Sequence, residues 1–250
     1  MRKNDFKPID LLLALVLLTR LPLPHLSKEV FARQAAAVWA FPLVGAVVGV
    51  VSIFAGAVAL IWCPTFVAAG IALATQVLVS GAMHEDGLAD TADGFWGGFD
   101  PKRRLEIMKD SHIGTYGVLA LLFGLGLRWS ILAALFEAGD IWCLMALASL
   151  SRAAMPVMMA SMPNARGRGL SQSVGRPAWP ATLVGLLIAL GVGFLSTGGS
   201  AIWAALVLGP LLLGLRQLAM TKIGGQTGDV LGATQQLSEI ALGLALLALL

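Results

Sequence analysis

Long apolar stretches alternate with short polar connections along most of the chain. A helix needs roughly 20 apolar residues to cross a bilayer, and seven stretches reach or approach that length: 36–61, 64–83, 115–136, 140–162, 179–198, 201–219 and 231–250. Helices pair their backbone groups internally, which the hydrocarbon interior requires of a spanning segment. The pattern therefore predicts an all-α fold, a polytopic integral membrane helical bundle with about seven spans.

The segment 9–24 is also apolar, but it is short, contains Arg20 and ends in two prolines. These features are more typical of a re-entrant or interfacial helix than of a full crossing. Composition agrees with a membrane protein, because 58% of the residues are hydrophobic and only 12% are charged. No soluble domain is recognisable, so we expect residues 1–250 to form a single integral membrane domain.

Positive charge is distributed unevenly among the connections. Lys and Arg occur in 1–35, 84–114, 163–178 and 220–230, and they are absent from 62–63, 137–139 and 199–200. The preference of basic loops for the cytoplasm places the four basic segments inside and the carboxyl terminus outside. The net charge of +3 has the same origin, so it does not indicate nucleic acid as a partner.

The most unusual polar stretch is HEDGLADTADG, at 84–94. If it continues the helix of 64–83, Asp86, Asp90 and Asp93 lie at i, i+4 and i+7 on one helix face. Carboxylates on one face repel one another unless a cation lies between them, and oxygen ligands suit Mg²⁺. Zinc is disfavoured because no second histidine or thiolate follows at a suitable spacing. The alternative is a solvated acidic helix end that binds no metal.

The segment MKDSHIGTYG, at 108–117, lies on the same predicted side as the acidic stretch. It brings Lys109, Asp110 and Ser111 to the start of the next span. Free backbone N–H groups at a helix start, together with a lysine, favour an anion. This segment is therefore a candidate substrate-binding site.

A glycine-rich turn, GGQTGDVLGA, precedes the last span at 224–233. It contains Gln226, Thr227 and Asp229. Glycine allows backbone amides to approach a phosphate closely, so the turn is a second candidate substrate-binding site. Asp229 is either an additional metal ligand or the cap of the following helix.

Several charged residues lie within or beside the apolar stretches and require partners; they include Arg152 and Arg216 as well as the three considered next. Arg20, near the predicted membrane boundary, either pairs with a phosphate or carboxylate or extends its side chain to the interface. Arg128 lies deeper, and a salt bridge to Glu137 is one explanation for it. Glu239, in the last span, is either a polar contact between helices or part of the site.

Four segments together resemble the cobalamin synthase family, adenosylcobinamide-GDP ribazoletransferase. They are HEDGLADTADG, MKDSHIGTYG, GGQTGDVLGA and the early LLTRLPLP, and they extend from Arg20 to Ala233. The resemblance implies a multi-pass enzyme of the cell inner membrane with its active face in the cytoplasm. It also implies that adenosylcobinamide-GDP is joined to alpha-ribazole, or to its 5′-phosphate, with release of GMP and a requirement for Mg²⁺. The chain departs from the family pattern at Gln236, usually a glutamate, and at His112, commonly an arginine.

The resemblance and the residues together give a set of expected roles. Asp86, Asp90, Asp93 and Glu85 are the expected Mg²⁺ ligands, and a carboxylate not fully engaged by metal, or His84, takes the proton of the attacking hydroxyl. The expected substrate-binding residues are Arg20, Arg104, Lys109, Asp110, Ser111, Gln226, Thr227 and Asp229. The oligomeric state is left open, a homo-oligomer included.

Two other functions are weighed against this one. Enzymes that make phospholipids from CDP-alcohols use a related aspartate set, but their DG..AR arginine is absent from the DGLAD of this chain. A cation-coupled transporter also uses intramembrane acids, but it typically places them near the bilayer midplane between inverted repeats. Here the acids are predicted at the cytoplasmic edge, and no repeat is evident.

Overall fold

The computed structural model describes residues 6–167 and 169–250 of the chain. Arg2, Lys3 and Arg168, which contribute to the predicted charge bias, lie outside the described residues. The described residues are mainly helical, and the only β pairing among them is a single bridge between Asn164 and Gln226. The predicted all-α class is therefore confirmed.

Six helical segments within the described residues are long and apolar enough to cross a membrane. They are η1 (Ala37–Ala40) continued by α3 (Phe41–Ala59), α7 (Thr115–Glu137), α8 (Cys143–Ser161), α10 (Trp179–Thr197), α11 (Gly199–Ala205) continued by α12 (Leu208–Ile223), and α13 (Gly228–Leu247). Each segment coincides with a predicted span, and its two ends lie within a few residues of the predicted ones. The polytopic membrane prediction is confirmed.

The remaining predicted span, 64–83, corresponds to α4 (Thr65–Ser80), and the acidic stretch does not continue this helix. The acidic stretch forms a separate helix, α5 (Met83–Gly97), which bends away from α4 by 86°. Gly81 and Ala82 produce the bend, because both have left-handed backbone conformations with φ of 66° and 56°. Such a conformation costs little for glycine and ends a helix.

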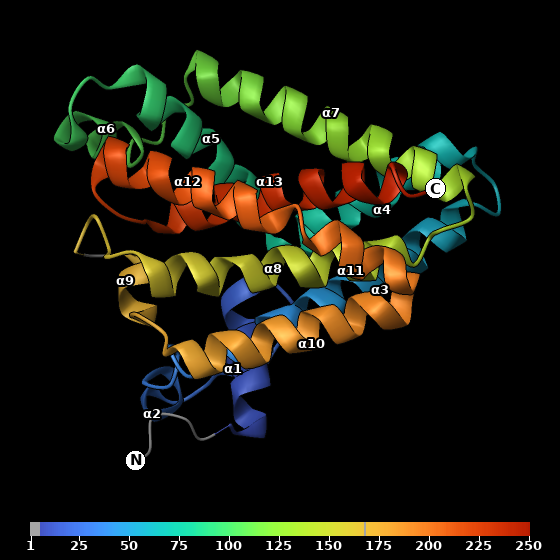
Figure 1. Cartoon of the computed structure of the whole chain (residues 1–250), viewed down its shortest axis with the longest axis horizontal. Helices are drawn as coiled ribbons and strands as arrows, with labels where there is room; N and C mark the ends of the chain where they lie inside the picture. Colours follow the sequence, from blue (N-terminus) through green and yellow to red (C-terminus); the bar gives the residue numbers. More distant parts are fainter. Residues whose placement is uncertain (1–5, 168) are drawn as a thin grey trace.

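The short helices lie outside the long spans. They are α1 (Pro8–Leu18), α2 (Lys28–Phe31), α6 (Pro101–Ile107) and α9 (Leu170–Val174). In Figure 1, α1 runs across the direction of α10 rather than along it, as expected for an interfacial or re-entrant helix. Asp10, buried in α1, accepts a hydrogen bond from the Arg33 Nε at 2.7 Å and anchors this helix to the segment before η1.

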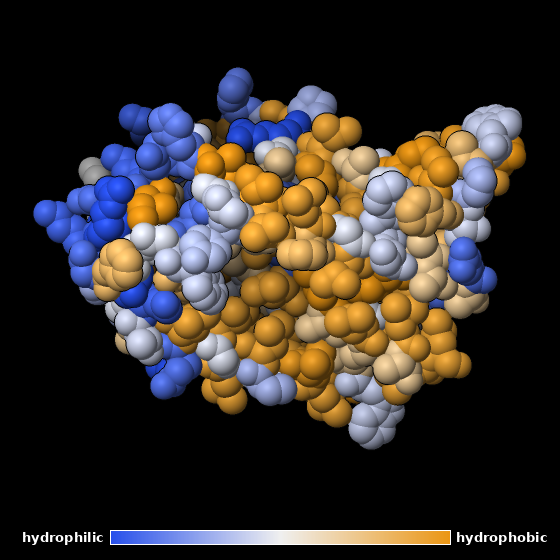
Figure 2. All heavy atoms as spheres, turned by 90° about the horizontal axis from the view of Figure 1, so that it is seen from above, coloured by the Kyte–Doolittle hydropathy of each residue, from blue (hydrophilic) through white to orange (hydrophobic). Residues whose placement is uncertain are grey.

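One end of the molecule is polar. Figure 1 places α6 and α9 at this end, with the carboxyl terminus at the other. Figure 2 shows hydrophilic residues gathered at one end and apolar residues over most of the remaining surface in view. We call this end, made up of α5, α6 and the segments 98–114, 162–167, 169–178 and 220–227, the polar end.

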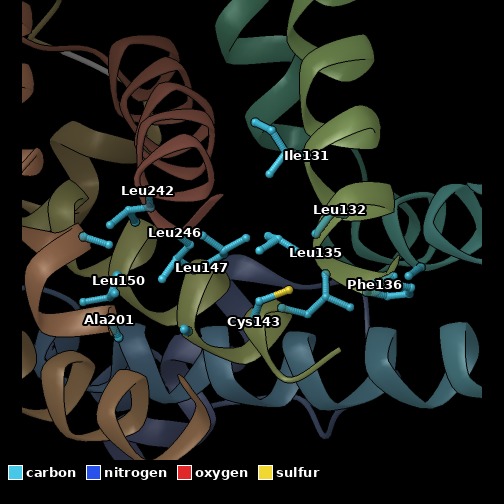
Figure 3. Packing of buried hydrophobic residues seen from close by; sticks show 14 of the residues in the cluster. Ile131, Leu132, Leu135, Phe136, Cys143, Leu147, Leu150, Ala201, Leu242 and Leu246 are labelled. Atoms are coloured by element: carbon cyan, nitrogen blue, oxygen red, sulfur yellow. The ribbon is translucent and has the colours of Figure 1, made fainter. Parts of the chain in front are cut away.

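The apolar core lies between α7, α8, α11 and α13. Figure 3 shows Leu135 of α7, Leu147 of α8 and Leu242 of α13 packed together within this core. Most of α8 is buried, so it forms the central helix of the bundle. The core fixes the relative positions of α8 and α13, and the polar ends of both helices contribute to the site described below.

Close packing of α3 on α8 depends on Gly45. A Cβ atom at this position would collide with the backbone of Ala148 and lie 2.6 Å from the Ser149 Cα. We therefore expect Gly45→Leu to abolish folding, detected as loss of the monodisperse size-exclusion peak in detergent. Gly191→Leu is the matched control, because nothing lies within 4 Å of a Cβ there. If both variants purify equally well, the described packing of α3 on α8 is wrong.

Candidate active site

The charged residues of the acidic helix α5 lie on two sides of the helix, one accessible and one buried. Asp86 is exposed and Asp90 is half-buried, whereas His84, Glu85 and Asp93 are buried. The predicted helical spacing of Asp86, Asp90 and Asp93 is present, but the three carboxylates do not share one environment. The bend between α4 and α5 places the helix at the polar end instead of along the α4 axis.

Asp93 joins α5 to the start of α7. Its carboxylate accepts hydrogen bonds from the backbone N–H groups of Gly114 at 2.7 Å and Gly117 at 2.8 Å. A Cβ at Gly114 would lie 2.5 Å from Oδ1 of Asp93, so glycine is required for this approach. A carboxylate is favourable at a helix N-terminus, where unpaired N–H groups concentrate. Asp93, an expected metal ligand, is therefore committed in this structure to holding the two helices together.

This role predicts a stability effect for Asp93. Hydrogen bonds to charged groups contribute about 1.5–3 kcal/mol each, so we expect Asp93→Ala to reduce the free energy of unfolding by at least about 2 kcal/mol. The thermal midpoint of the detergent-solubilised protein measures this effect. Asp86→Ala is the control, since Asp86 is exposed on the same helix. An equal midpoint for both variants would contradict the structural role of Asp93.

Glu85 points into the bundle and belongs to a buried polar network. Its Oε1 pairs with Nη1 of Arg128 at 3.0 Å and accepts from Nε2 of Gln236 at 2.9 Å. Arg128 also pairs with Glu239 and donates to Gln76 at 2.6 Å. Glu85 therefore does not join Asp86 and Asp90 as a metal ligand in this structure. Arg128 pairs with Glu85 and Glu239, and not with Glu137, because both partners face the same buried space.

Close contact between α5 and α13 brings a further acid to α5. A Cβ at Gly232 would lie 3.2 Å from the Cα of Gly87, so the two helices touch backbone to backbone. Asp229, at the start of α13, consequently lies close enough to Asp86 and Asp90 for its charge to act on both. The structure thus brings Asp86, Asp90 and Asp229 together from two distant motifs.

The glycine-rich turn is fixed by the segment after α8. The N–H of Gln226 donates to the carbonyl of Pro163, and the N–H of Ala165 donates to the carbonyl of Gln226, both at 2.9 Å. Thr227 is the cap of α13, because its Oγ1 accepts from the N–H of Val230 at 3.3 Å. The cap interpretation of Asp229 is therefore wrong. The side chains of Gln226 and Thr227 are buried at the base of the turn.

Arg166 is a site residue that the sequence reasoning missed. Its Nη2 lies 2.9 Å from Oδ2 of Asp229, so a cation faces the acidic cluster. Beside it is a cavity of about 270 Å³ that is also lined by Lys102 and Lys109. Neither lysine has an ion-pair partner among residues 6–167 and 169–250. In the sequence, Arg166 contributed only to the charge bias, and nothing local identifies its partner 63 positions away.

The other predicted basic residues have different environments. Arg104 donates to the carbonyls of Gly98 and Lys222, both at 2.9 Å, so its guanidinium ties α6 to α12 and is not directed at a ligand. Arg20 is exposed, and its side chain lies over Gly81 at the bend between α4 and α5. The Arg20 guanidinium has no hydrogen bond or ion pair with any described residue, so it is available to an anion.

The segment after α6 is exposed. Asp110 and His112 form an ion pair at 2.7 Å, and Ser111 lies beside them on the surface. The hydrogen bond and the charge of Asp110 raise the pKa of His112, and the same pair lowers the pKa of Asp110. A cavity of about 310 Å³ extends from Asp110 and His112 to Asp93 and Gly114. This second opening lies on the α7 side of α5.

Within the described part of the chain, no three His, Cys, Asp or Glu side chains are arranged as a metal-binding group. The carboxylates that remain near one another are Asp86, Asp90 and Asp229, and Arg166 partly balances their charge. The site is therefore an acidic cluster of oxygen donors bordered by cationic side chains.

The fold and this site together define an all-α polytopic membrane protein with a polar end suited to phosphate chemistry. The family model described as cobalamin-5-phosphate synthase matches residues 10–247, so the chain belongs to that family.

Curated relatives agree with this family. Proteins named adenosylcobinamide-GDP ribazoletransferase from Mesorhizobium japonicum and Azorhizobium caulinodans are 40% and 45% identical to the chain. The first alignment covers 93% of this chain and 90% of the relative, and the second covers 91% of each. No solved structure matches the chain. The family description and the names of these relatives support neither the CDP-alcohol phosphotransferase nor the transporter alternative.

Proposed function

We propose that this chain is an adenosylcobinamide-GDP ribazoletransferase. The proposal is that it joins adenosylcobinamide-GDP to alpha-ribazole, or to its 5′-phosphate, and releases GMP. Membership of the family and the names of the relatives support this activity. The structural observation that carries it is the meeting of Asp86, Asp90 and Asp229 with Arg166 and the two lysines of the neighbouring cavity.

The reaction transfers a phosphoryl group between two oxygen atoms. A ribose hydroxyl of alpha-ribazole attacks the phosphorus on the cobinamide side of the diphosphate. A new P–O bond forms to the ribose, the P–O bond to GMP breaks, and GMP leaves with the bridging oxygen. Such a reaction depends on in-line positioning and charge neutralisation more than on covalent catalysis. Lys102, Lys109 and Arg166 are suited to neutralise the diphosphate and the departing phosphate.

The donors present fit Mg²⁺, although they do not form a complete site by themselves. Mg²⁺ is usually bound by one or two carboxylates, with water and substrate phosphates filling the remaining positions. Asp86 and Asp90, with Asp229 beside them, supply such carboxylates from an accessible helix face. When bound, Mg²⁺ would stabilise negative charge on the phosphate oxygens. Glu85 and Asp93 are not part of this proposed set, because each is held by other partners.

The proton of the attacking hydroxyl passes to a carboxylate oxygen of the same cluster in this proposal. A general base must lie within hydrogen-bond reach of that proton. Asp86 and Asp90 are accessible from the polar end, whereas His84 is only 2% exposed. His84 is therefore removed from the set of proton acceptors.

We also propose that the polar end faces the cytoplasm across the cell inner membrane. The basic segments 98–114, 162–167, 169–178 and 220–227 are at this end, and cytoplasmic loops are rich in Lys and Arg. The substrates are nucleotide derivatives, which are made in the cytoplasm.

Mass spectrometry of the products tests the proposed activity. The purified full-length protein in detergent is given both substrates, and we expect a corrinoid product that contains the ribazole and one phosphate, together with GMP in equal amount. Omitting either substrate is expected to abolish both products. GMP release without alpha-ribazole would indicate hydrolysis and would contradict the transferase proposal.

A further inference from the structure

A cavity beside the acidic cluster has a different chemical character from the two cavities described above. Its walls are mainly apolar and come from helices that are distant in sequence, including Leu18 of α1, Phe41 of α3, Met155 and Met159 of α8, and Leu231 of α13. Gly228 of the glycine-rich turn also lines it, which places the cavity next to Asp229. The cavity therefore extends from the polar end into the bundle.

One polar group in this wall lacks a partner. His84 lines the cavity, and its Nε2 atom is buried without a hydrogen bond to any described residue. A buried ring nitrogen without a partner costs free energy, so its retention indicates a ligand that supplies the missing hydrogen bond. Ser171, the other polar side chain in the wall, already accepts from Nδ2 of Asn164 at 2.7 Å. The cavity thus offers an apolar surface and one unused hydrogen-bonding atom.

The substrates in the proposed reaction contain three ring systems of very different character. Guanine carries several donors and acceptors around its edge, which these apolar walls would leave unpaired. The corrin ring is far larger than this cavity, which has only about 50 Å³ of open space. The base of alpha-ribazole is a benzimidazole, a fused apolar ring system with one free ring nitrogen, and this combination matches the wall and the single Nε2 atom.

We propose that this cavity binds the benzimidazole base of alpha-ribazole and that His84 donates a hydrogen bond from Nε2 to the free ring nitrogen. The proposal rests on the transferase function proposed above. The open space is about 50 Å³, so the base enters by displacing the side chains of Met155 and Met159. Methionine suits this role, because its flexible thioether adapts to an aromatic ring.

Binding of the base in this cavity orients the rest of the nucleoside. With the ring between α8 and α13, the ribose extends past Gly228 toward the acidic cluster. His84 lies only two residues before Asp86 on α5. One helix therefore contacts both the base and the ribose of the nucleoside. His84 is thus a substrate-binding residue that determines base specificity.

Two-substrate kinetics with an altered base tests the proposal. GMP release by the purified full chain is measured with alpha-ribazole and with an indole riboside, which replaces the free ring nitrogen by carbon. We expect the wild-type KM for the indole compound to be about tenfold higher, the effect of one lost hydrogen bond. The KM for adenosylcobinamide-GDP is expected to remain within about twofold, since its binding site is elsewhere.

Variants of His84 complete the test. His84→Leu is expected to raise the KM for alpha-ribazole about tenfold, with kcat retained. The KM values of this variant for alpha-ribazole and for the indole riboside are expected to be equal. His84→Gln, whose amide also donates, is expected to recover part of the preference. Met158→Leu is the control, because Met158 is buried in α8 but does not line the cavity.

Equal use of ribazole and the indole riboside by the wild type would overturn the proposal, even if His84→Leu fails to fold. A loss of kcat with unchanged KM in His84→Leu would also overturn it, since His84 would then act on the reacting atoms. Failure of the wild type to release GMP with the natural pair would instead reject the transferase function itself.

Discussion

Asp86→Asn and Asp90→Asn are each expected to lower the rate of GMP release by at least about 100-fold, as does removal of a group that stabilises transition-state charge in other enzymes. Both residues are accessible on α5 at the polar end, and Asp229 lies beside them. Asparagine keeps the size of the side chain but removes the negative charge that would hold Mg²⁺. The initial rate at saturating substrates, with both substrates and Mg²⁺ present, measures the effect.

Glu137→Gln is the matched control for these variants. Glu137 is an exposed acid at the far end of α7, away from the polar end. We expect its rate to equal that of the wild type. The aspartate variants are expected to keep the wild-type thermal midpoint, because neither carboxylate holds two helices together as Asp93 does. Wild-type rates in both aspartate variants would show that the acidic cluster is not the active site.

The second large effect is a loss of thermal stability, which we expect for substitution of Arg128. Its guanidinium is buried between α4, α5, α7 and α13, where it pairs with Glu85 and Glu239 and donates to Gln76 and Gln236. Removing one partner of a buried ion pair costs about 3–5 kcal/mol, because the remaining charge is left uncompensated. Arg128→Leu leaves Glu85 without a cationic partner, whereas Glu239 keeps Arg152 at 3.8 Å. We expect its thermal midpoint in detergent to fall by roughly 10 °C.

Arg216→Leu provides the comparison, because Arg216 also lies in a spanning helix but has no ion-pair partner among the described residues. Its thermal midpoint is expected to change little, since surface substitutions usually alter stability by less than about 0.5 kcal/mol. If the two arginine variants have the same midpoint, the buried network does not stabilise the bundle.

This network also gives a physical reason for Gln236. The resemblance described in the sequence analysis implies a glutamate at this position. Here Arg128 and Arg152 face Glu85 and Glu239, so two positive and two negative side chains balance one another. A glutamate at 236 would add an unbalanced charge, whereas the amide of Gln236 both accepts from Arg128 and donates to Glu85.

The arrangement of spans could be predicted from the sequence because each depends on local composition. A spanning helix needs only enough apolar residues in succession. The segment 9–24 could be separated from the spans on the same grounds, since Arg20 and the two prolines shorten it. The acidic residues of α5 and the turn before α13 were also identifiable, because polar groups beside a span are costly and rare.

The bend before α5 could not be predicted, because nothing in the neighbouring sequence indicates that Ala82 adopts a left-handed backbone conformation. The bend, in turn, decides which side chains face the bundle. Glu85 and Asp93 sit within the same acidic motif as Asp86 and Asp90, but their partners are Arg128 and the start of α7. Arg166 was missed for the same reason, since only tertiary structure brings it to Asp229.

We propose that the polar end joins alpha-ribazole to adenosylcobinamide-GDP in a metal-dependent reaction. GMP release by the purified protein, with both substrates and with either Mg²⁺ or excess chelator, tests this claim most directly. We predict release that requires both substrates, stops with chelator and returns when Mg²⁺ is added in excess. Release that continues at the same rate in chelator would contradict the claim that carboxylate-bound metal serves the reaction.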